Sequence, residues 1–465
     1  MPSPYDPVVI DGMKTSQDGR YHTSPLPGEI GDMDAALDLL GQNGWDLIDI
    51  YGRNAVFESR AITGTSPTDA FGRTRTSEPY TIGDYKIITD VLPSTMLSAS
   101  SGTAGVTMNV SQSSYTVYSS GSSGSYALVQ SKKYHNYMPG KSQLILQSFV
   151  MGPAVSGSIK RAGYFDDHDG IFLEQDQTGS LNWVIRSSTN DTVSENRVKQ
   201  SDWNIRTLFN EPYIIDVTKS QLLFIDFQWL AVGRVRCGFA YKGEFVLTHV
   251  FDHSNVLDKA YMREPDLPVR VEVRNTTTTT ASMVGICATV MSEGGNPEAG
   301  KTWAVSSGRA LQSVASGSTQ PLLAIRLKNK FNGYDNRSYV RLIDSSVFAV
   351  DRSLLYRVYK LPSQAFITTS SAWVSVNDES CMEYNINISG YTDGRELLNG
   401  FVPAGGTGQG NFQSAQNTQI SNALSDNYIA QNFNSTDSEI YVVVATNLTA
   451  NATTAAATMQ WAEVL

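Results

Sequence analysis

Apolar and polar residues alternate along much of this chain, in short runs that end at Gly, Pro, Asn, Asp or Ser. The strongest pattern lies at 222–240, where a largely apolar run and a turn around 232–234 precede a second run. In that second run Val235, Cys237 and Phe239 occupy every other position. A period of two is that of a β-strand with one buried face. The segment therefore predicts a β-hairpin.

Runs of the same kind recur in two series. The first extends from residue 85 to residue 291, with turn signals roughly every 8–12 residues, a spacing typical of antiparallel sandwiches and jelly rolls. A Gly-rich segment at 294–300 separates it from a second series, whose last two runs, 439–445 and 456–463, are expected to pair as a closing hairpin. The predicted fold class is mainly β, with two antiparallel β-sandwich or jelly-roll-like domains.

A small α+β module is predicted ahead of the two β domains. Asp32 is a suitable N-cap, and Leu37 and Leu40 share one face of the helix expected after it. An alternating run from Trp45 and a returning run at 55–60 predict a hairpin. The expected order is an extended arm, the α+β attachment module, a connector, a β-sandwich domain and a C-terminal β domain, at residues 1–30, 31–62, 63–84, 85–295 and 296–465.

Composition narrows the partners of the chain. Hydrophobic residues make up 41% of the 465 residues, enough for packed cores, whereas charged residues make up 17%, below the roughly 25% usual in soluble domains. The 35 basic and 45 acidic residues give a net charge of −10 without a dense Lys/Arg cluster, so we expect no nucleic-acid partner. No apolar run approaches the ~20 residues that a membrane-spanning helix requires, so we expect no membrane insertion.

The three cysteines, Cys237, Cys287 and Cys381, are odd in number and far apart. Cys237 and Cys287 lie in apolar strand-like runs, which favours reduced, buried thiols over a disulfide framework. The first residues lack the basic start and the apolar core of a secretory signal. Both observations favour a protein that matures in a reducing cytoplasm.

An acidic loop is one candidate metal site. Asp166, Asp167 and Asp169 lie close together and are followed by Gly170. Carboxylate oxygens at such short spacing are ligands that Ca²⁺ prefers, although the EF-hand order and its terminal Glu are missing. The alternative is an Asx turn that joins two strands of a hairpin.

A pair of carboxylates follows this loop. A strand would present Glu174 and Asp176 on one face, because they are two residues apart. Jelly-roll glycosidases use a Glu-x-Asp strand with a second Glu as acid/base, and here Gln177, Thr178 and Gly179 stand where that Glu is needed. We therefore favour a polar sheet face over a catalytic pair.

The remaining motifs do not predict a cofactor. His249 and His253 lie four residues apart at a predicted strand end, but no third ligand accompanies them, so a zinc site is not expected. The Gly-rich segment 406–410 lacks the strand–helix context of a phosphate-binding loop. No cofactor is therefore expected.

Several longer segments carry a resemblance. Residues 161–176, 227–236 and 267–275, together with 70–80 and 137–143, resemble a family of virion structural proteins from tailed bacteriophages. The helix and Gly-Trp-Asp-Leu unit at 35–47 resembles a small domain family of unknown function. The phage resemblance covers roughly residues 70–295, and it implies a structural or fibre-like component rather than a mechanism.

These observations lead to one expected function. The chain is expected to be a non-enzymatic component of a tailed-phage virion (tail fibre, neck or baseplate) that is assembled in the bacterial cytoplasm. We expect it to form a homo-oligomer, with a trimer favoured, and to attach to other virion proteins through its N-terminal arm and module. The alternatives are a capsid decoration protein and a receptor protein that binds or degrades a host-surface glycan. The expected attachment residues are Leu37, Leu40, Trp45, Phe71 and Tyr80.

Overall fold

The computed structural model describes residues 78–88, 95–209, 213–294, 300–308, 311–392, 394–403 and 428–464, together with the backbone of four strands between residues 14 and 59. Antiparallel strands dominate, and the helical residues of these segments are confined to four short 3₁₀ turns. The mainly β prediction is confirmed. The described residues contain no helix that could span a membrane. Contacts divide the chain into two units, residues 1–77 and 78–465.

The first unit contains one four-stranded sheet in the order β1-β2-β4-β3. The predicted hairpin is present, because β3 and β4 pair antiparallel from Trp45↔Ser59 to Tyr51↔Asn54. The segment expected as an arm differs from the prediction, since its strand β2 pairs with β4 and its strand β1 pairs with β2, which extends this sheet. The helix predicted after Asp32 lies outside the described residues. The strands are β1 (Lys14–Thr15), β2 (Tyr21–Pro25), β3 (Trp45–Tyr51) and β4 (Asn54–Ser59).

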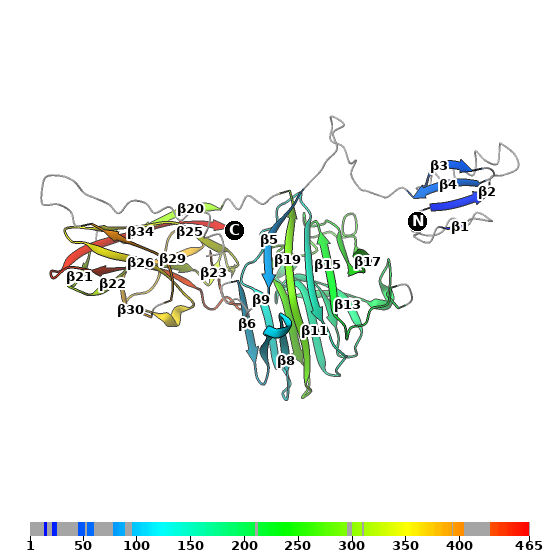
Figure 1. Cartoon of the computed structure of the whole chain (residues 1–465), viewed down its shortest axis with the longest axis horizontal. Coiled ribbons are helices and arrows are strands. Elements are labelled where there is room, and N and C mark those ends of the chain that lie inside the picture. The colour runs from blue at the N-terminus through cyan, green and yellow to red at the C-terminus, as the bar shows by residue number, and fades with distance from the viewer. Residues whose placement is uncertain are drawn as a thin grey trace. The chain divides into compact units, whose positions relative to one another are not determined.

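The second unit begins with a sandwich of two antiparallel sheets (Figure 1). The eight-stranded sheet has the order β17-β16-β15-β10-β19-β8-β7, with β5 also on β19, and the seven-stranded sheet has the order β14-β13-β12-β11-β18-β9-β6. The strands of the larger sheet are β5 (Pro79–Lys86), β7 (Gly105–Asn109), β8 (Ser114–Ser119), β10 (Gln143–Val150), β15 (Gln221–Phe227), β16 (Val235–Tyr241), β17 (Glu244–Phe251) and β19 (Ala281–Glu293). Those of the smaller sheet are β6 (Met96–Ser101), β9 (Tyr126–Ser131), β11 (Ser158–Phe165), β12 (Gly170–Gln175), β13 (Leu181–Ser187), β14 (Ser194–Lys199) and β18 (Val269–Asn275).

The predicted hairpin at 222–240 lies in the larger sheet and is confirmed. Strands β15 and β16 pair with Phe227 opposite Val235, and the turn is closed by a 3.1 Å hydrogen bond from the Gln228 amide to the Arg234 carbonyl. The alternating residues of both sheets meet in one buried core that includes Trp183 and Ile225. Period-two burial therefore fixes which face of each strand enters the core.

The connector predicted at 63–84 overlaps this sandwich. Strand β5 pairs with β19 from Cys287↔Lys86 to Glu293↔Pro79, and the Ile82 side chain is buried in the core. The last residues assigned to the connector are therefore part of the larger sheet. Burial of Ile82 and Tyr85 provides the apolar contact that holds β5 there.

A second sandwich occupies the C-terminal part of the unit. One sheet has the order β20-β34-β25-β32, with β21 on β34, and the other has the order β28-β29-β22-β33-β26-β31. Their shared core is built around the buried Tyr441 and Trp461. The strands are β20 (Lys301–Ser306), β21 (Gln312–Val314), β22 (Thr319–Leu327), β25 (Tyr339–Ala349), β26 (Leu354–Leu361), β28 (Val374–Ser375), β29 (Met382–Asn385), β31 (Arg395–Val402), β32 (Tyr428–Ile429), β33 (Ile440–Asn447) and β34 (Thr453–Val464). Two-stranded ribbons add β23 (Lys330–Phe331) with β24 (Tyr334–Asp335), and β27 (Ile367–Thr369) with β30 (Ile388–Tyr391).

The predicted closing hairpin is wrong. Both of its strands exist, but β33 pairs with β22 and β26 in one sheet, whereas β34 pairs with β20, β21 and β25 in the other. The short segment between them therefore crosses from sheet to sheet. Two apolar strands separated by a few residues satisfy either arrangement locally, and the long-range partners decide between them.

One cysteine also departs from the prediction. Cys237 and Cys381 are buried free thiols, but Cys287 is exposed. The Cys287 position alternates with the buried Ala288 on β19, so its side chain lies on the outward face of the larger sheet. The expectation of a buried thiol fails there because strand β19 is apolar on both faces.

Candidate functional site

The acidic loop 166–170 joins β11 to β12, and its first carboxylate forms an Asx turn. Asp166 Oδ1 accepts hydrogen bonds from the backbone amides of His168 and Asp169, at 2.8 and 2.9 Å. Burial raises the pKa of Asp166, but the charges of Arg337 and Arg270 outweigh it and hold the pKa below its ordinary value. The Asp166 carboxylate is therefore ionised and occupied by protein groups.

The other two candidate calcium ligands have separate partners. Asp167 Oδ1 accepts hydrogen bonds from Arg270 Nη1 at 2.8 Å and from Arg274 Nη2 at 3.1 Å. Asp169 accepts the Ser188 hydroxyl at 2.6 Å and the Arg263 amide at 2.9 Å. Among the described residues, no group of three acidic, His or Cys side chains is arranged to hold a metal ion. The geometry matches the Asx-turn alternative.

The candidate carboxylate pair is divided between two environments. Glu174, the residue before the end of β12, accepts hydrogen bonds from Arg161 Nε and Arg197 Nε, both at 2.8 Å. Asp176 follows the strand and closes a turn by accepting the Thr178 hydroxyl at 2.6 Å and the Ser180 amide at 3.0 Å. The two carboxylates therefore have different partners and do not form a pair.

Glu174 belongs to a network that covers the outward face of the smaller sheet. At its centre, Glu272 on β18 lies 2.6 Å from Arg274 Nε, 2.9 Å from Arg161 Nη1 and 3.3 Å from Arg270 Nη1, and its side chain is 1% exposed. Burial raises the pKa of Glu272, but the three arginines lower it far more. We call this set the ionic face: Arg161, Asp167, Glu174, Arg186, Glu195, Arg197, Arg270, Glu272 and Arg274.

The arginines of the ionic face also cover an apolar layer. Phe165 and Phe172 form a buried cluster with Val184 on the same side of the sheet. The Arg186 guanidinium lies 5.0 Å from the centre of the Phe172 ring, and that of Arg270 lies 5.3 Å from the Phe165 ring, both within cation–π range. The face is therefore covered by its own side chains, and Glu272 at its centre is held as an anion.

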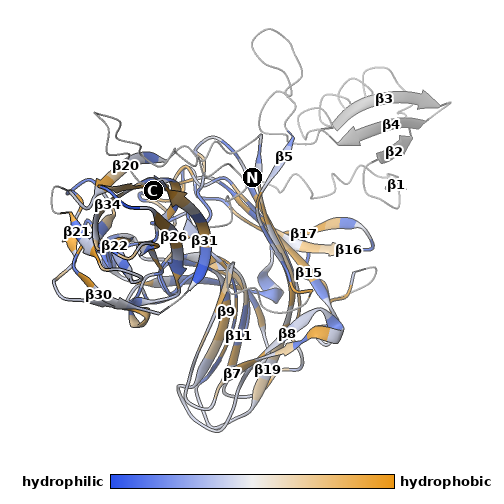
Figure 2. Ribbon diagram, turned by 60° about the vertical axis from the view of Figure 1, so that its left-hand side comes forward, coloured by the Kyte–Doolittle hydropathy of each residue, from blue (hydrophilic) through white to orange (hydrophobic). Residues whose placement is uncertain are grey.

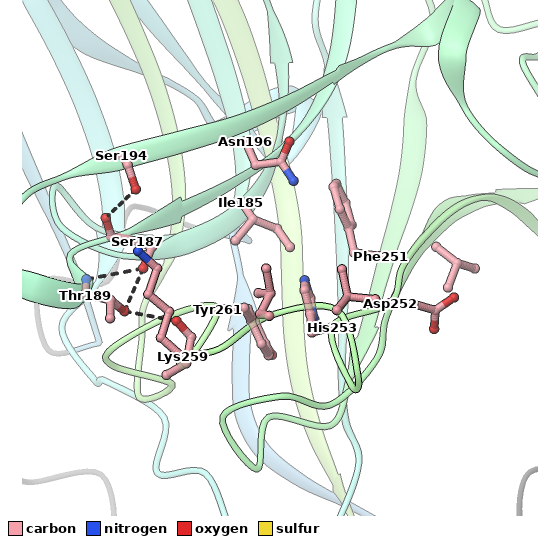
Figure 3. A pocket seen from close by; sticks show the side chains of 14 residues that line it. Ile185, Ser187, Thr189, Ser194, Asn196, Phe251, Asp252, His253, Lys259 and Tyr261 are labelled. Carbon is pink, nitrogen blue, oxygen red and sulfur yellow. Dashed lines mark hydrogen bonds between the residues drawn. The ribbon is translucent and has the colours of Figure 1, made fainter.

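A separate cavity lies in the same sandwich (Figure 3). It has a volume of about 330 Å³ and lies between β13–β14 of the smaller sheet and the end of β17 with the segment 252–261. Its floor is made of buried side chains from both sheets, and its rim combines exposed polar side chains with the exposed apolar side chains of Val256 and Leu257. We call it the end pocket. The floor residues are Ile185, Phe251, His253 and Tyr261, and the rim residues include Ser194, Asn196, Asp252 and Lys259.

An aromatic stack orders the floor of the end pocket. The His253 ring stacks on Tyr261, with centroids 4.1 Å apart and planes 11° apart. His253 Nδ1 lies 2.7 Å from the Gly233 carbonyl, and burial lowers the pKa of the imidazole. The ring is therefore neutral at pH 7, and because a carbonyl only accepts, Nδ1 carries the proton. Nε2 is left as a hydrogen-bond acceptor.

Hydroxyl groups join the two walls of the end pocket. The Thr189 hydroxyl donates to the Ala260 carbonyl at 3.2 Å, which ties β13 to the segment 252–261. The Ser187 hydroxyl donates to Thr189 Oγ1 at 2.9 Å. His249, the other residue of the histidine pair, accepts the Asn204 amide at 3.2 Å, so His249 and His253 bind different groups. In the sequence, only the pair His249 and His253 marked this region, because the walls of the pocket are about 60 residues apart in the chain.

The expected attachment residues are only partly described. Tyr80 lies on β5 with 48% of its surface exposed, and Trp45 is the first residue of β3. Leu37, Leu40 and Phe71 lie outside the described residues. Of the two described residues, Trp45 belongs to the first unit and Tyr80 to the second.

No protein-family model matches the sequence, and no curated protein matches it significantly. Among solved structures, the fold is similar to a protein of unknown function from Shewanella oneidensis MR-1, with a TM-score of 0.32, 11% identity, and coverage of 47% of this chain and 88% of that chain. A glycosyl hydrolase family protein from Mycobacterium fortuitum gives a TM-score of 0.31, 10% identity, and coverage of 46% and 98%. A legume lectin-like domain from Entamoeba histolytica gives 0.26, 8%, and coverage of 44% and 95%. Likenesses at this level do not assign a function.

Proposed function

We propose that this chain is a non-enzymatic structural component of a tailed-phage virion that acts in assembly and in host contact. The observation that carries the proposal is an apolar outward face on the larger sheet of the first sandwich, placed opposite a smaller sheet whose outward face is closed by ion pairs. The apolar face of the larger sheet is suited to pack against another protein surface, and the ion-paired face of the smaller sheet is suited to stabilise the sandwich itself. The resemblance at residues 70–295 provides the virion context.

The apolar face extends over β17, β16, β15, β10 and β19. Phe245 on β17 is 59% exposed and packs against the Phe224 ring, with centroids 5.0 Å apart. Gly238 on β16 leaves room for Phe224, because a Cβ there would stand 2.5 Å from the ring. Figure 2 shows hydrophobic residues along β15 to β17. Partly exposed side chains continue the face at Leu144, Leu146, Leu222, Leu247 and Met291.

The occupant proposed for this face is a second copy of the chain. The charged groups around it are paired, Asp226 with Arg236 and Asp84 with Lys86, so two copies meet without net repulsion at these positions. This matters because the whole chain carries a net charge of −10. Apolar sheet faces with a paired polar rim are typical of stable protein interfaces. The trimer expected from the sequence is one closed arrangement in which each copy would bury its apolar face against the other copies.

The ionic face is proposed to stabilise the sandwich and not to catalyse a reaction. Acid–base catalysis by a carboxyl group requires a pKa near the working pH, whereas Glu272 is held far below it. Glu174 is fully engaged by two arginines. Attachment to other virion proteins is assigned to the N-terminal segment, and capsid decoration is the alternative location.

The test of the virion role is quantitative mass spectrometry of purified phage particles from the source culture. We expect the chain in the particle at a small multiple of the tail symmetry. A copy number that scales with the capsid surface would assign it to the head. Absence from the particle would overturn the proposal.

Self-association is tested by native mass spectrometry of the purified chain. We expect an oligomer that dissociates in Phe245→Lys, because the new charge enters the apolar face. Phe401→Lys is the matched control, since Phe401 is 70% exposed on β31 of the second sandwich. A monomeric wild type, or dissociation by Phe401→Lys alone, would show that the apolar face is not the interface.

A further inference from the structure

The end pocket has the dimensions of a small-ligand site. Its volume of about 330 Å³ is at the lower end of the roughly 300–1,000 Å³ of such sites, so it accommodates one or two rings and not a folded protein segment. It lies on the first sandwich, away from the residues that form the ionic face. The strands and the segment that enclose it are held together by the Thr189 hydrogen bond.

Its lining combines an apolar floor with a rim of mixed donors and acceptors. Ile185 and Phe251 present apolar atoms at the base, next to the His253 ring, whose Nε2 accepts hydrogen bonds. The rim offers the Asn196 amide and the Ser194 hydroxyl, both on exposed positions of β14. This arrangement suits a ligand with one apolar ring face and hydroxyl groups around its edge.

Charge narrows the class of ligand further. Asp252 is paired with Arg234, with Nε 2.6 Å from Oδ1, so its charge is compensated. Lys259 is the one basic side chain among the described lining residues, too few for a phosphate-rich ligand such as a nucleotide. The polar groups of the lining are therefore mainly neutral hydrogen-bonding groups, and they stand beside apolar side chains such as Ile185, Phe251 and Val256.

We infer that the end pocket binds a mono- or disaccharide unit of a surface glycan. The ring C–H groups of the sugar lie over the apolar floor, and its hydroxyls bond to Asn196, Ser194 and His253 Nε2. The inference deepens the host-contact part of the proposed function and rests on it for its biological meaning. It differs from a glycosidase reading, because no free carboxyl pair lines the pocket among the described residues.

The experiment is a glycan array probed with the purified full chain, followed by calorimetric titration of the best mono- or disaccharide. Asn196→Trp fills the pocket from its exposed rim, and we expect it to lower the affinity at least about tenfold, or about 1.4 kcal/mol. Lys199→Trp is the matched control: it lies on the same strand, is exposed, and faces away from the pocket opposite Asn182. It should change the affinity by less than about twofold, within about 0.4 kcal/mol.

Two further outcomes decide the inference. Ser194→Trp is a second pocket-filling variant, and thermal unfolding checks that each variant keeps the wild-type fold. Failure of the wild-type chain to bind any saccharide on the array, or equal binding by both folded pocket variants, overturns it. Absence of the chain from phage particles with saccharide binding intact would overturn the virion role alone.

Discussion

Two acidic regions of the first sandwich lie only a few residues apart in the sequence, but the pKa values of their carboxyl groups are shifted in opposite directions. Glu272 lies on β18 in the ionic face, and its pKa is held well below the ordinary value. Glu264 and Asp266 lie just before β18 and line a pocket of about 240 Å³ that also includes Asp335. Burial followed by the charge of Glu264 raises the pKa of Asp266 to about 8, and burial raises that of Glu264 to about 7.

The two pKa shifts differ in sign because the two regions differ in the arginines that contact their carboxyl groups. Burial raises the carboxyl pKa in both regions, but Glu272 contacts three arginines. Arg263, the neighbour of Glu264, directs its guanidinium elsewhere: it lies 4.4 Å from the centre of the Tyr334 ring, and its Nε donates to Ser188 Oγ. The comparison teaches that burial sets the size of the electrostatic effect, whereas the contacts of the nearest arginine set its sign.

The largest effect is expected from Glu272→Gln. The substitution leaves Arg161, Arg270 and Arg274 around a neutral group in a buried site, so the free energy of unfolding should fall by about 3–5 kcal/mol at pH 7. Denaturant unfolding measures this loss. The Glu272 contribution is present above its unfolded pKa and is lost as the pH falls towards its lowered folded pKa, so the difference from wild type should shrink below about pH 4.

A milder pair provides the control for that measurement. Arg326 and Glu383 in the second sandwich are 2.6 Å apart with side chains 18% exposed, so Glu383→Gln should cost no more than about 1 kcal/mol. If Glu383→Gln and Glu272→Gln lowered the free energy of unfolding equally, the burial of the ionic network would not add to the cost of losing an ion pair.

Asp266→Asn is expected to raise the free energy of unfolding, whereas Glu272→Gln lowers it. The unfolded carboxyl ionises above about pH 4, whereas the folded one stays protonated until about pH 8, so wild-type stability should decline as the pH rises through this window. The asparagine removes that penalty and its Oδ1 still accepts the Tyr137 amide. We expect a gain on the order of 1–3 kcal/mol at pH 8–9 and none near pH 4. Thermal unfolding at both pH values tests it, and a loss at pH 9 would contradict it.

Glu264→Gln should act in the same direction with a smaller effect. Its pKa of about 7 is closer to the unfolded value, so the window of declining wild-type stability ends about one unit earlier. The expected gain at pH 8 is on the order of 1 kcal/mol. Stability curves of the two single variants and the double variant give the coupling of the carboxyls, which should be non-additive because the charge of Glu264 raises the pKa of Asp266. Strict additivity would place them in independent sites.

Local sequence was sufficient for much of the fold. Alternation predicted the β15–β16 hairpin and most strands of both sandwiches, because side-chain period and turn residues are properties of neighbouring positions. It failed for β33 and β34, whose main sheet partners lie roughly 80–160 residues away in the sequence. It also missed the strands β1 and β2, because the partner of β2 is the distant strand β4 and β1 in turn pairs with β2.

The sites were harder to predict for the same reason. The acidic residues at 166–176 were visible in the sequence, but the arginines that bind them come from other strands, such as Arg197 on β14 and Arg270 on β18. The sequence therefore showed the carboxylates but not the arginines that form ion pairs with them. The end pocket could hardly be predicted from the sequence. Asn196 and His253 belong to no recognisable motif, and only the fold places β14 near the end of β17.

The smallest change in the free energy of unfolding is expected from Asp252→Asn. This variant separates the effect of burial from that of contact distance. Asp252 Oδ1 lies 2.6 Å from Arg234 Nε, the same distance as Glu272 Oε1 from Arg274 Nε. The Asp252 side chain is 55% exposed, whereas that of Glu272 is 1% exposed. Water solvates the exposed pair in both the folded and the unfolded chain, so Asp252→Asn should change the free energy of unfolding by less than about 0.5 kcal/mol. Denaturant unfolding without saccharide checks this, and a loss comparable to that of Glu272→Gln would mean that contact distance, and not burial, sets the strength of these ion pairs.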